Sequence, residues 1–527
     1  MLKTIAACET NKDKALFLLL AAIASVVLAV AIGGLAYLFS GPVTSGTWYN
    51  KYFILFAAML LFSIALFFTF RKDIKDKPER VFLAVVLVFT MGSSILFDVN
   101  KVSWDAESHF RFMLSWTEPD GTVELNEAEQ DAIYGYAARF ETDIAALNDW
   151  KGYLNEAEGI STDESFSSAP LTSFYNRIAS IPGSIVYMLC GALGVSFSIT
   201  YVLTKLIYAL IYSIVCYRGM KLLRSGKMIF ASIAMLPAAL FIAANYGYDY
   251  WVTCWILYAA ARLVGELQRP DQQLTLKSAL LMFGAFVVAC GPKAIYFPLA
   301  ALALTMPRSK FASSAHSRIF RAACIVVPLL IASSFLLNFV GSVSSGAETG
   351  DSRGGSDVST IGQVQFILSD IPHYLVVLFG YLLGDYSYHV VHDTALWAYL
   401  GFPMLRTWVL TALIVAFVTV TDKEPTDKTA LSNWKTRTWS LVVGVGTLCL
   451  VATSMYISYT VVASDTIAGV QPRYAFPLLV VLLFLGSPKL GGMVRVGHEC
   501  VYNTAILALL TGIPYLVLWQ TYIALLA

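Results

Sequence analysis

The feature that most constrains this chain is a series of long apolar runs that occupy much of its length. Among its 527 residues, 57% are hydrophobic and only 13% are charged. A run of about 20 apolar residues spans the hydrocarbon core of a bilayer, and in lipid a helix satisfies its own backbone hydrogen bonds. The sequence therefore predicts an all-α polytopic membrane protein and excludes a soluble multidomain enzyme.

Charge and cysteine usage exclude several other classes. The formal net charge is +1, so nothing favours nucleic acid as a partner. The eight cysteines are scattered, without a CxxC or a Cys/His spacing, so we expect neither a zinc site nor a disulfide framework. The first apolar run, 15–38, is too long for the core of a signal peptide and lacks a convincing cleavage site, so we interpret it as a retained span.

Basic residues set the predicted orientation. Three spans come first, at about 15–38, 52–70 and 81–97. The stretch 71–80, at the junction of the second and third, contains five basic residues and should be cytoplasmic by the positive-inside rule. The N-terminus is then also cytoplasmic, and the segment that follows the third span lies outside.

Two further apolar segments are better placed along the outer surface than across the membrane. If 178–193 crossed, the cations at the end of the next span would reach the outer face, namely Arg218, Lys221, Arg224 and Lys227. If 361–383 crossed, every later span would invert, although this segment is apolar enough to do so. We expect two surface helices and keep a crossing by 361–383 as the alternative.

The resulting topology has about thirteen transmembrane helices and an outer C-terminus. The later spans fall at about 201–217, 228–244, 250–267, 276–290, 294–306, 319–339, 398–420, 438–460, 474–485 and 501–527. The chain accordingly divides into five segments: three N-terminal helices (1–97), an outer loop with an acidic motif and surface helices (98–198), helices four to nine (199–340), a second outer loop with a surface helix (341–397), and helices ten to thirteen (398–527).

The stretch 104–111 concentrates ionisable residues at the start of the first outer loop: Asp105, Glu107, His109 and Arg111. Charges this close to a bilayer are costly unless they face a cavity, a partner or water, so the cluster points to function. The alternative is a solvated charged linker. Farther along, 124–158 has helical periodicity, and its acids are expected to form a wet helix face.

The predicted topology brings other polar residues to the same outer rim. They are Tyr248, Asp249, Lys293, Gln471, Arg473 and Tyr474. A carboxylate can act as a general base on a hydroxyl, and Lys or Arg at a span end suits a phosphate at headgroup depth. Tyrosine rings at that depth can stack on sugars. We therefore predict catalytic roles in the acidic motif and substrate binding by Arg111 and these six residues.

Each of these residues also has a structural explanation. Arg473 with Tyr474 can be an interfacial anchor, Lys293 can extend to the headgroups, and Asp249 can be an acid favoured by the helix dipole. His109 is better explained as a hydrogen-bonding neighbour than as a metal ligand. The pair His389 and His392 lies near acids but lacks a third ligand at a suitable spacing, so a loop is favoured over a metal site.

The chain resembles the DUF2142-type bacterial membrane proteins of the GT-C glycosyltransferase superfamily. The resemblance runs along nearly the full length and rests on short motifs in a fixed order: Asp105…His109-Phe110, Ser168-Ala169-Pro170-Leu171, Asn245-Tyr246-Gly247-Tyr248-Asp249, Lys293-Ala294-Ile295-Tyr296-Phe297-Pro298 and Gly469-Val470-Gln471-Pro472-Arg473-Tyr474-Ala475-Phe476-Pro477. The last is similar to the family's Gly-Arg-Tyr pattern and is the most specific.

This resemblance implies a GT-C-like fold in a bacterial plasma membrane and an inverting sugar transfer on the outer face. The donor would be a polyprenyl-phosphate-linked sugar and the acceptor an envelope glycan or protein, without a cofactor other than a possible divalent cation. Asp105 would be the general base, Arg473 and Lys293 would hold the phosphate, and His109 and Asp249 would shape the site.

Two departures from the family pattern affect these roles. The family usually has adjacent Asp and Glu three residues before the His, whereas here Ala106 follows Asp105 and an acid returns at Glu107. The base is therefore either Asp105 or Glu107. Pro472 replaces the glycine that usually precedes the Arg.

Two functions of other classes compete with sugar transfer. A transporter or flippase of a lipid-linked saccharide needs charges in the middle of its spans, and the chain offers mainly Lys205, with Arg406 a weaker case. The sequence also lacks the internal repeat typical of many transporters. A non-catalytic scaffold for envelope synthesis is the second alternative, and it would tolerate loss of Asp105.

Overall fold

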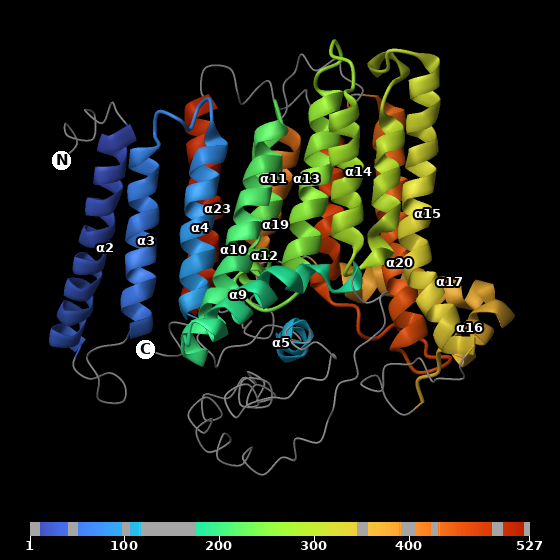
Figure 1. Cartoon of the computed structure of the whole chain (residues 1–527), viewed down its shortest axis with the longest axis horizontal. Coiled ribbons are helices and arrows are strands. Elements are labelled where there is room, and N and C mark those ends of the chain that lie inside the picture. Colours follow the sequence, from blue (N-terminus) through green and yellow to red (C-terminus); the bar gives the residue numbers. More distant parts are fainter. Residues whose placement is uncertain are drawn as a thin grey trace.

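The protein is a bundle of upright helices with shorter helices at one end, as the computed structural model in Figure 1 shows. All regular secondary structure in the part of the chain that the structure describes is helical. The described residues are 11–40, 51–96, 106–114, 116, 175–344, 357–388, 390, 407–422, 431, 433–486 and 499–520.

The first half of the chain supplies α2 (Asn11–Ser40), α3 (Lys51–Thr69), α4 (Pro78–Leu96), α5 (Ala106–Leu114), α9 (Ile181–Ala192), α10 (Phe197–Leu222), α11 (Lys227–Ala234) and α12 (Pro237–Ala243). The second half supplies α13 (Asp249–Leu267), α14 (Leu276–Cys290), η3 (Ala294–Thr305), α15 (Ser314–Ser344), α16 (Thr360–Ser369), α17 (Ile371–Tyr381), η6 (Leu382–Tyr386), α19 (Thr407–Thr421), α20 (Trp434–Ser458), η9 (Pro472–Val481), α21 (Leu482–Leu485) and α23 (Glu499–Leu518).

Within the described residues, five helices are long and apolar enough to cross a bilayer, and a bent pair raises the number to six. Seven more apolar segments are shorter. The all-helical membrane fold is thus confirmed, and every predicted span overlaps a described helix. The number thirteen and the GT-C fold stay predictions.

The two segments expected along the surface differ from the upright helices. Helix α9 runs across the ends of its neighbours, the orientation predicted for 178–193 (Figure 1). Segment 361–383 forms a bent pair in place of the single helix expected, because α16 and the α17–η6 segment meet at 109°. Asp370 lies at the bend, where its side chain accepts a hydrogen bond from the His373 amide and caps α17.

Prolines interrupt three of the predicted spans. The predicted span 228–244 divides into α11 and α12 immediately before Pro237, since a proline disfavours helical backbone at the preceding residue. Pro298 lies within η3 and Pro477 within η9, and both segments wind as 3₁₀ helices. A proline cannot donate the backbone hydrogen bond that a regular α-helix needs.

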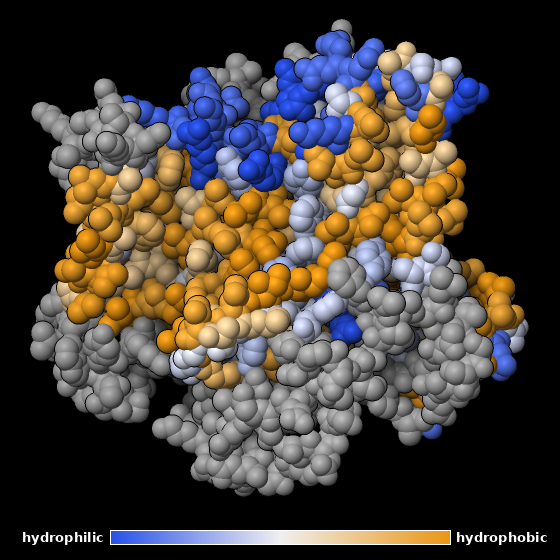
Figure 2. Space-filling view, in the orientation of Figure 1, coloured by the Kyte–Doolittle hydropathy of each residue, from blue (hydrophilic) through white to orange (hydrophobic). Residues whose placement is uncertain are grey.

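One end of the bundle, which we call the basic end, carries the loop between α3 and α4 and the starts of α4, α11 and α14. Figure 2 shows hydrophilic residues at this end above a broad apolar belt. Ion pairs and hydrogen bonds join separate elements here. Lys227 Nζ lies 2.7 Å from Glu79 Oε2, and the Lys310 ammonium lies 3.1 Å from Glu266 Oε2. The segments predicted to be cytoplasmic are therefore neighbours in space.

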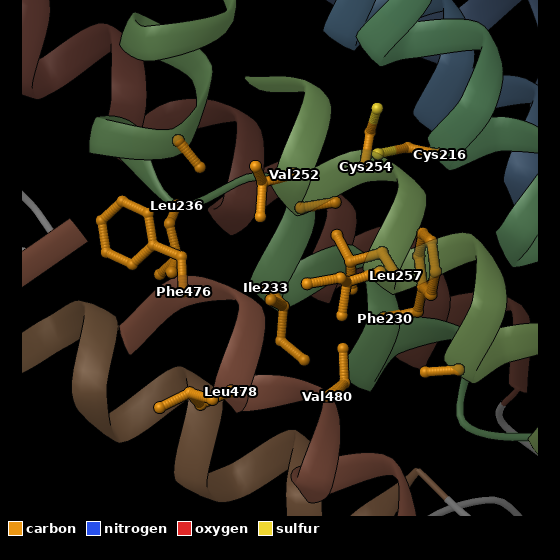
Figure 3. Packing of buried hydrophobic residues seen from close by; sticks show 14 of the residues in the cluster. Cys216, Phe230, Ile233, Leu236, Val252, Cys254, Leu257, Phe476, Leu478 and Val480 are labelled. Atoms are coloured by element: carbon orange, nitrogen blue, oxygen red, sulfur yellow. The ribbon is translucent and has the colours of Figure 1, made fainter. Parts of the chain in front are cut away.

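Toward the opposite end of the bundle, η9 packs against α13 in the hydrophobic core. Figure 3 shows Phe476, Leu478 and Val480 of η9 packed beside Ile233 and Val252. All five side chains are buried. Because α13 and η9 pack together in this way, their first turns lie beside each other. We call this the site end, and it also carries α5 and α9 (Figure 1).

Candidate functional site

Three charged side chains from distant parts of the chain meet at the site end. Asp249 Oδ2 lies 2.9 Å from Arg473 Nε, and Asp249 Oδ1 lies 3.2 Å from Lys293 Nζ. The side chains of Asp249 and Arg473 are only 10% and 2% exposed. We call Asp249, Lys293 and Arg473 the charge triad. The sequence predicted that these residues share one rim, and the structure brings them into direct contact.

The position of Asp249 favours its ionised form. It opens α13, where the helix dipole stabilises negative charge, and it contacts two cations. Asp249 is therefore both an acid at a helix N-terminus, as one explanation expected, and the ion-pair partner of Lys293 and Arg473. One carboxylate and two cations leave the charge triad with a net charge of +1.

Two tyrosine rings bracket the Lys293 ammonium. Its Nζ lies 3.3 Å from the centroid of the Tyr474 ring and 5.1 Å from that of Tyr248. A cation over an aromatic face is stabilised by the quadrupole of the ring, more so where water is excluded. The two predicted aromatic residues thus lie against one of the predicted cations, and they hold it inside the protein instead of at the headgroups.

Glycines in tight turns precede both cations. A Cβ added at Gly291 would lie 2.6 Å from the Tyr175 carbonyl oxygen, a distance that real Cβ atoms do not reach. Gly469 has φ of +78°, and a Cβ there would lie 2.5 Å from the Tyr459 ring. Only glycine fits these turns, which bring Lys293 and Arg473 toward Asp249.

Helix α5 brings the acidic motif toward the charge triad. The His109 ring lies edge-on to the Tyr248 ring, with 4.6 Å between centroids. The next residue, Phe110, is 1% exposed and packs against Tyr201 and Tyr246. Ser184 of α9 donates a hydrogen bond to the Met113 carbonyl. Anchored on both sides, α5 places His109 next to the residue that precedes Asp249.

The structure describes the other predicted site residues in part or not at all. Asp105, which directly precedes α5, lies outside the described residues. His389 and His392, in the second loop, lie outside them as well. Glu107 and Arg111 belong to α5, but the structure describes only their backbone. The predicted helix 124–158 is also outside the described residues. The roles proposed for these residues remain predictions.

Gln471 shows a feature suited to ligand binding. Its side-chain Oε1 is buried and makes no hydrogen bond within the described part of the chain. Its backbone carbonyl accepts a hydrogen bond from the Tyr386 hydroxyl at 3.3 Å. A buried acceptor without a donor is unfavourable, and a ligand hydroxyl could satisfy it.

The sequence reasoning missed two residues that contact the turn carrying Arg473. Tyr386 is one, and Tyr296 of η3 is the other, since its hydroxyl donates to the Tyr474 carbonyl at 2.8 Å. Both lie within apolar segments, where a tyrosine is indistinguishable from a core aromatic. For Tyr296, the sequence signal that could have found it is its place in the family-like motif 293–298, three residues after Lys293.

The charge triad contains the residue types that can bind an anion. Two cations with different geometries, a planar fork and a point charge, face one carboxylate beside a histidine and two tyrosines. Among the described residues, no group of three or more His, Cys, Asp or Glu is arranged to hold a metal ion.

These features define a polytopic helical membrane protein with a buried ionic site at one end of its bundle. The model of the DUF2142 family, described as a predicted membrane protein, matches residues 105–482, and the chain belongs to this family. The match begins at the acidic motif and ends within α21, so it includes every member of the charge triad. Comparison with curated proteins and with solved structures found no match.

Proposed function

We propose that the protein is a GT-C-type glycosyltransferase that moves a sugar from a polyprenyl-phosphate donor to a cell-envelope acceptor. The observation that carries the proposal is the charge triad, a buried cluster with a net positive charge beside the helix that follows Asp105. By the positive-inside rule the basic end is cytoplasmic, so the site end faces outward. A lipid-linked donor then replaces a nucleotide sugar.

In this proposal the phosphate of the donor binds Lys293 and Arg473. The guanidinium contributes two parallel donors and the ammonium a compact charge. When the bond between the anomeric carbon and the phosphate oxygen breaks, the leaving polyprenyl phosphate gains negative charge. Fixed cations in a site shielded from water stabilise that charge more than water does.

The acceptor hydroxyl attacks the anomeric carbon from the side opposite the phosphate, which inverts the configuration. Its proton passes to the carboxylate of Asp105 or Glu107. The contact between His109 and Tyr248 supports this assignment, because it puts α5 beside the charge triad. The rings of Tyr248 and Tyr474 would stack on the sugar or shield the phosphate.

Purified protein in lipid nanodiscs tests the proposal, with a radiolabelled polyprenyl-phosphate sugar and an envelope extract as acceptor. We expect labelled product from the wild type, and loss of product in Asp105→Asn or in Glu107→Gln, whichever residue is the base. Asp271→Asn, in an exposed loop at the basic end, is the matched control and should retain activity. Equal turnover in all variants would contradict the enzymatic role.

The same preparation separates the two alternatives. A flippase would move the labelled lipid across vesicles without breaking the sugar–phosphate bond. A scaffold would neither transfer the sugar nor move the lipid. Envelope-synthesis proteins would still co-purify with it when Asp105 and Glu107 are both replaced.

A further inference from the structure

The turn that carries Arg473 is held by two buried tyrosine hydroxyls from separate elements. Tyr296 of η3 donates to the carbonyl of Tyr474, the residue after Arg473. Tyr386 of η6 donates to the carbonyl of Gln471, two residues before Arg473. Both rings are about 2% exposed or less. The two bonds thus fix the backbone on both sides of the cation.

We propose that Tyr296 and Tyr386 are positioning residues that hold the Arg473 guanidinium in the orientation needed to bind a lipid phosphate. The inference rests on the proposed function, because it assigns the phosphate to Arg473. The hydroxyls of Tyr296 and Tyr386 donate to backbone carbonyls on either side of Arg473. Each acts on Arg473 through the main chain.

The local backbone explains why such support is needed. Gly469 has a positive φ, and Pro472 removes one backbone donor just before Arg473. Arg473 is then the second residue of η9, a 3₁₀ segment instead of a regular helix. The Gln471 carbonyl accepts from the Tyr474 amide, and the Tyr386 hydroxyl adds a second donor. Three residues after Tyr474 stands Pro477, which has no N–H, so the Tyr296 hydroxyl supplies the donor that the 3₁₀ pattern lacks there.

The two tyrosines also link the site to different parts of the fold. Tyr296 lies three residues after Lys293, which directly precedes η3, so one short stretch of chain carries one cation and helps to position the other. Tyr386 ends the bent pair, which also carries exposed apolar side chains, among them Leu368, Val376 and Leu383. The position of Arg473 therefore depends both on the core and on an apolar element at the site end.

The experiment compares hydroxyl-deletion variants in nanodiscs, with radiolabelled farnesyl phosphate as the probe. Tyr296→Phe should weaken binding about tenfold, and Tyr386→Phe, whose hydrogen bond is longer, about threefold. Tyr212→Phe is the matched control, because Tyr212 is a fully buried tyrosine that donates to the Ala234 carbonyl at 2.8 Å, away from the site. Its binding should equal that of the wild type.

A double-mutant cycle with Arg473→Gln separates positioning from a general structural role. If the tyrosines act through Arg473, the Tyr→Phe effect should shrink below twofold in the Arg473→Gln background. Full additivity, or equal weakening by Tyr212→Phe, would overturn the inference. Thermal unfolding of each variant checks that it is folded.

The same data keep this inference distinct from the proposed function. If Arg473→Gln binds the probe as tightly as the wild type, Arg473 does not bind the phosphate. The proposed function and the positioning role are then both wrong. If Arg473→Gln binds more weakly but Tyr296→Phe and Tyr386→Phe do not, only the positioning role is wrong.

Discussion

The two ends of the bundle both bury charged side chains, but in different proportions. At the basic end two largely buried lysines each pair with one carboxylate, Lys227 with Glu79 and Lys310 with Glu266. At the site end Asp249 faces two cations at once. The two pairs at the basic end join separate elements of the fold. In the proposed function the second cation beside Asp249 is available to the donor phosphate, so we expect the ligand at the site end.

The largest effect we expect is on stability, at the basic end. Lys310 is fully buried and bonds both Glu266 and the Arg269 carbonyl. Lys310→Met should lower the free energy of unfolding by about 3 kcal/mol, because the partly buried Glu266 carboxylate loses its lysine partner and keeps the hydrogen bond from Ser278. Titration with a denaturing detergent measures the loss. Transfer activity per folded molecule should not change, and Lys277→Met, which alters an exposed lysine, should affect neither quantity.

At the site end the corresponding change should affect the reaction more than the fold. Arg473→Gln removes one cation and leaves Asp249 paired with Lys293, so the protein should still fold. Sugar transfer should fall about 10²- to 10³-fold, the typical effect of removing one preorganised donor. The matched variant Arg437→Gln alters an arginine that bonds backbone carbonyls at the basic end. A comparable fall in that variant would erase the distinction between the ends.

Removing the carboxylate gives opposite signs for stability and binding at the site end. Asp249→Asn should lower the unfolding midpoint, since it leaves two buried cations unneutralised. The same variant should bind farnesyl phosphate about tenfold more tightly, because Asp249 no longer competes for Lys293 and Arg473. Glu79→Gln at the basic end should lower stability with no gain in binding. Weaker binding by Asp249→Asn would show that the carboxylate orients the cations instead of competing with the ligand.

The smallest effect concerns an exposed pair at the basic end. Arg80 and Asp73 are 3.0 Å apart, but the arginine side chain is 44% exposed. Asp73→Asn should change the free energy of unfolding by less than about 1 kcal/mol, as for most surface ion pairs. A loss as large as that of Lys310→Met would mean that burial does not decide which of these pairs matters.

Much of the fold could be predicted because hydrophobic length reports directly on membrane helices. The predicted span 276–290 coincides with α14, and the orientation of α9 followed from the cations after α10. Interruptions were harder to predict. The bend at Asp370 and the division before Pro237 depend on caps and backbone geometry that an average of hydropathy does not contain.

The candidate site was predictable to the extent that it consists of charged residues at span ends. Asp249, Lys293 and Arg473 stood out because a charge is unusual beside lipid. Their pairing needed the packing of η9 on α13, which the sequence does not specify. Tyr296 and Tyr386 could not be singled out, because burial of a tyrosine ring has no charge signature and its hydroxyl partner is a backbone carbonyl.

The packing of α23 has a consequence for how the chain is made. Tyr515 hydrogen-bonds Ser63 across 452 residues of sequence and packs against Phe56 and Phe89. At roughly 5 to 20 residues per second, a ribosome needs about 20 to 90 seconds between these residues. Throughout that interval the first helices sit in the bilayer with a polar hydroxyl and two rings facing lipid or a chaperone. The packing of α3 on α4 can form earlier, but Ser63, Phe56 and Phe89 gain their contacts with Tyr515 only when α23 arrives.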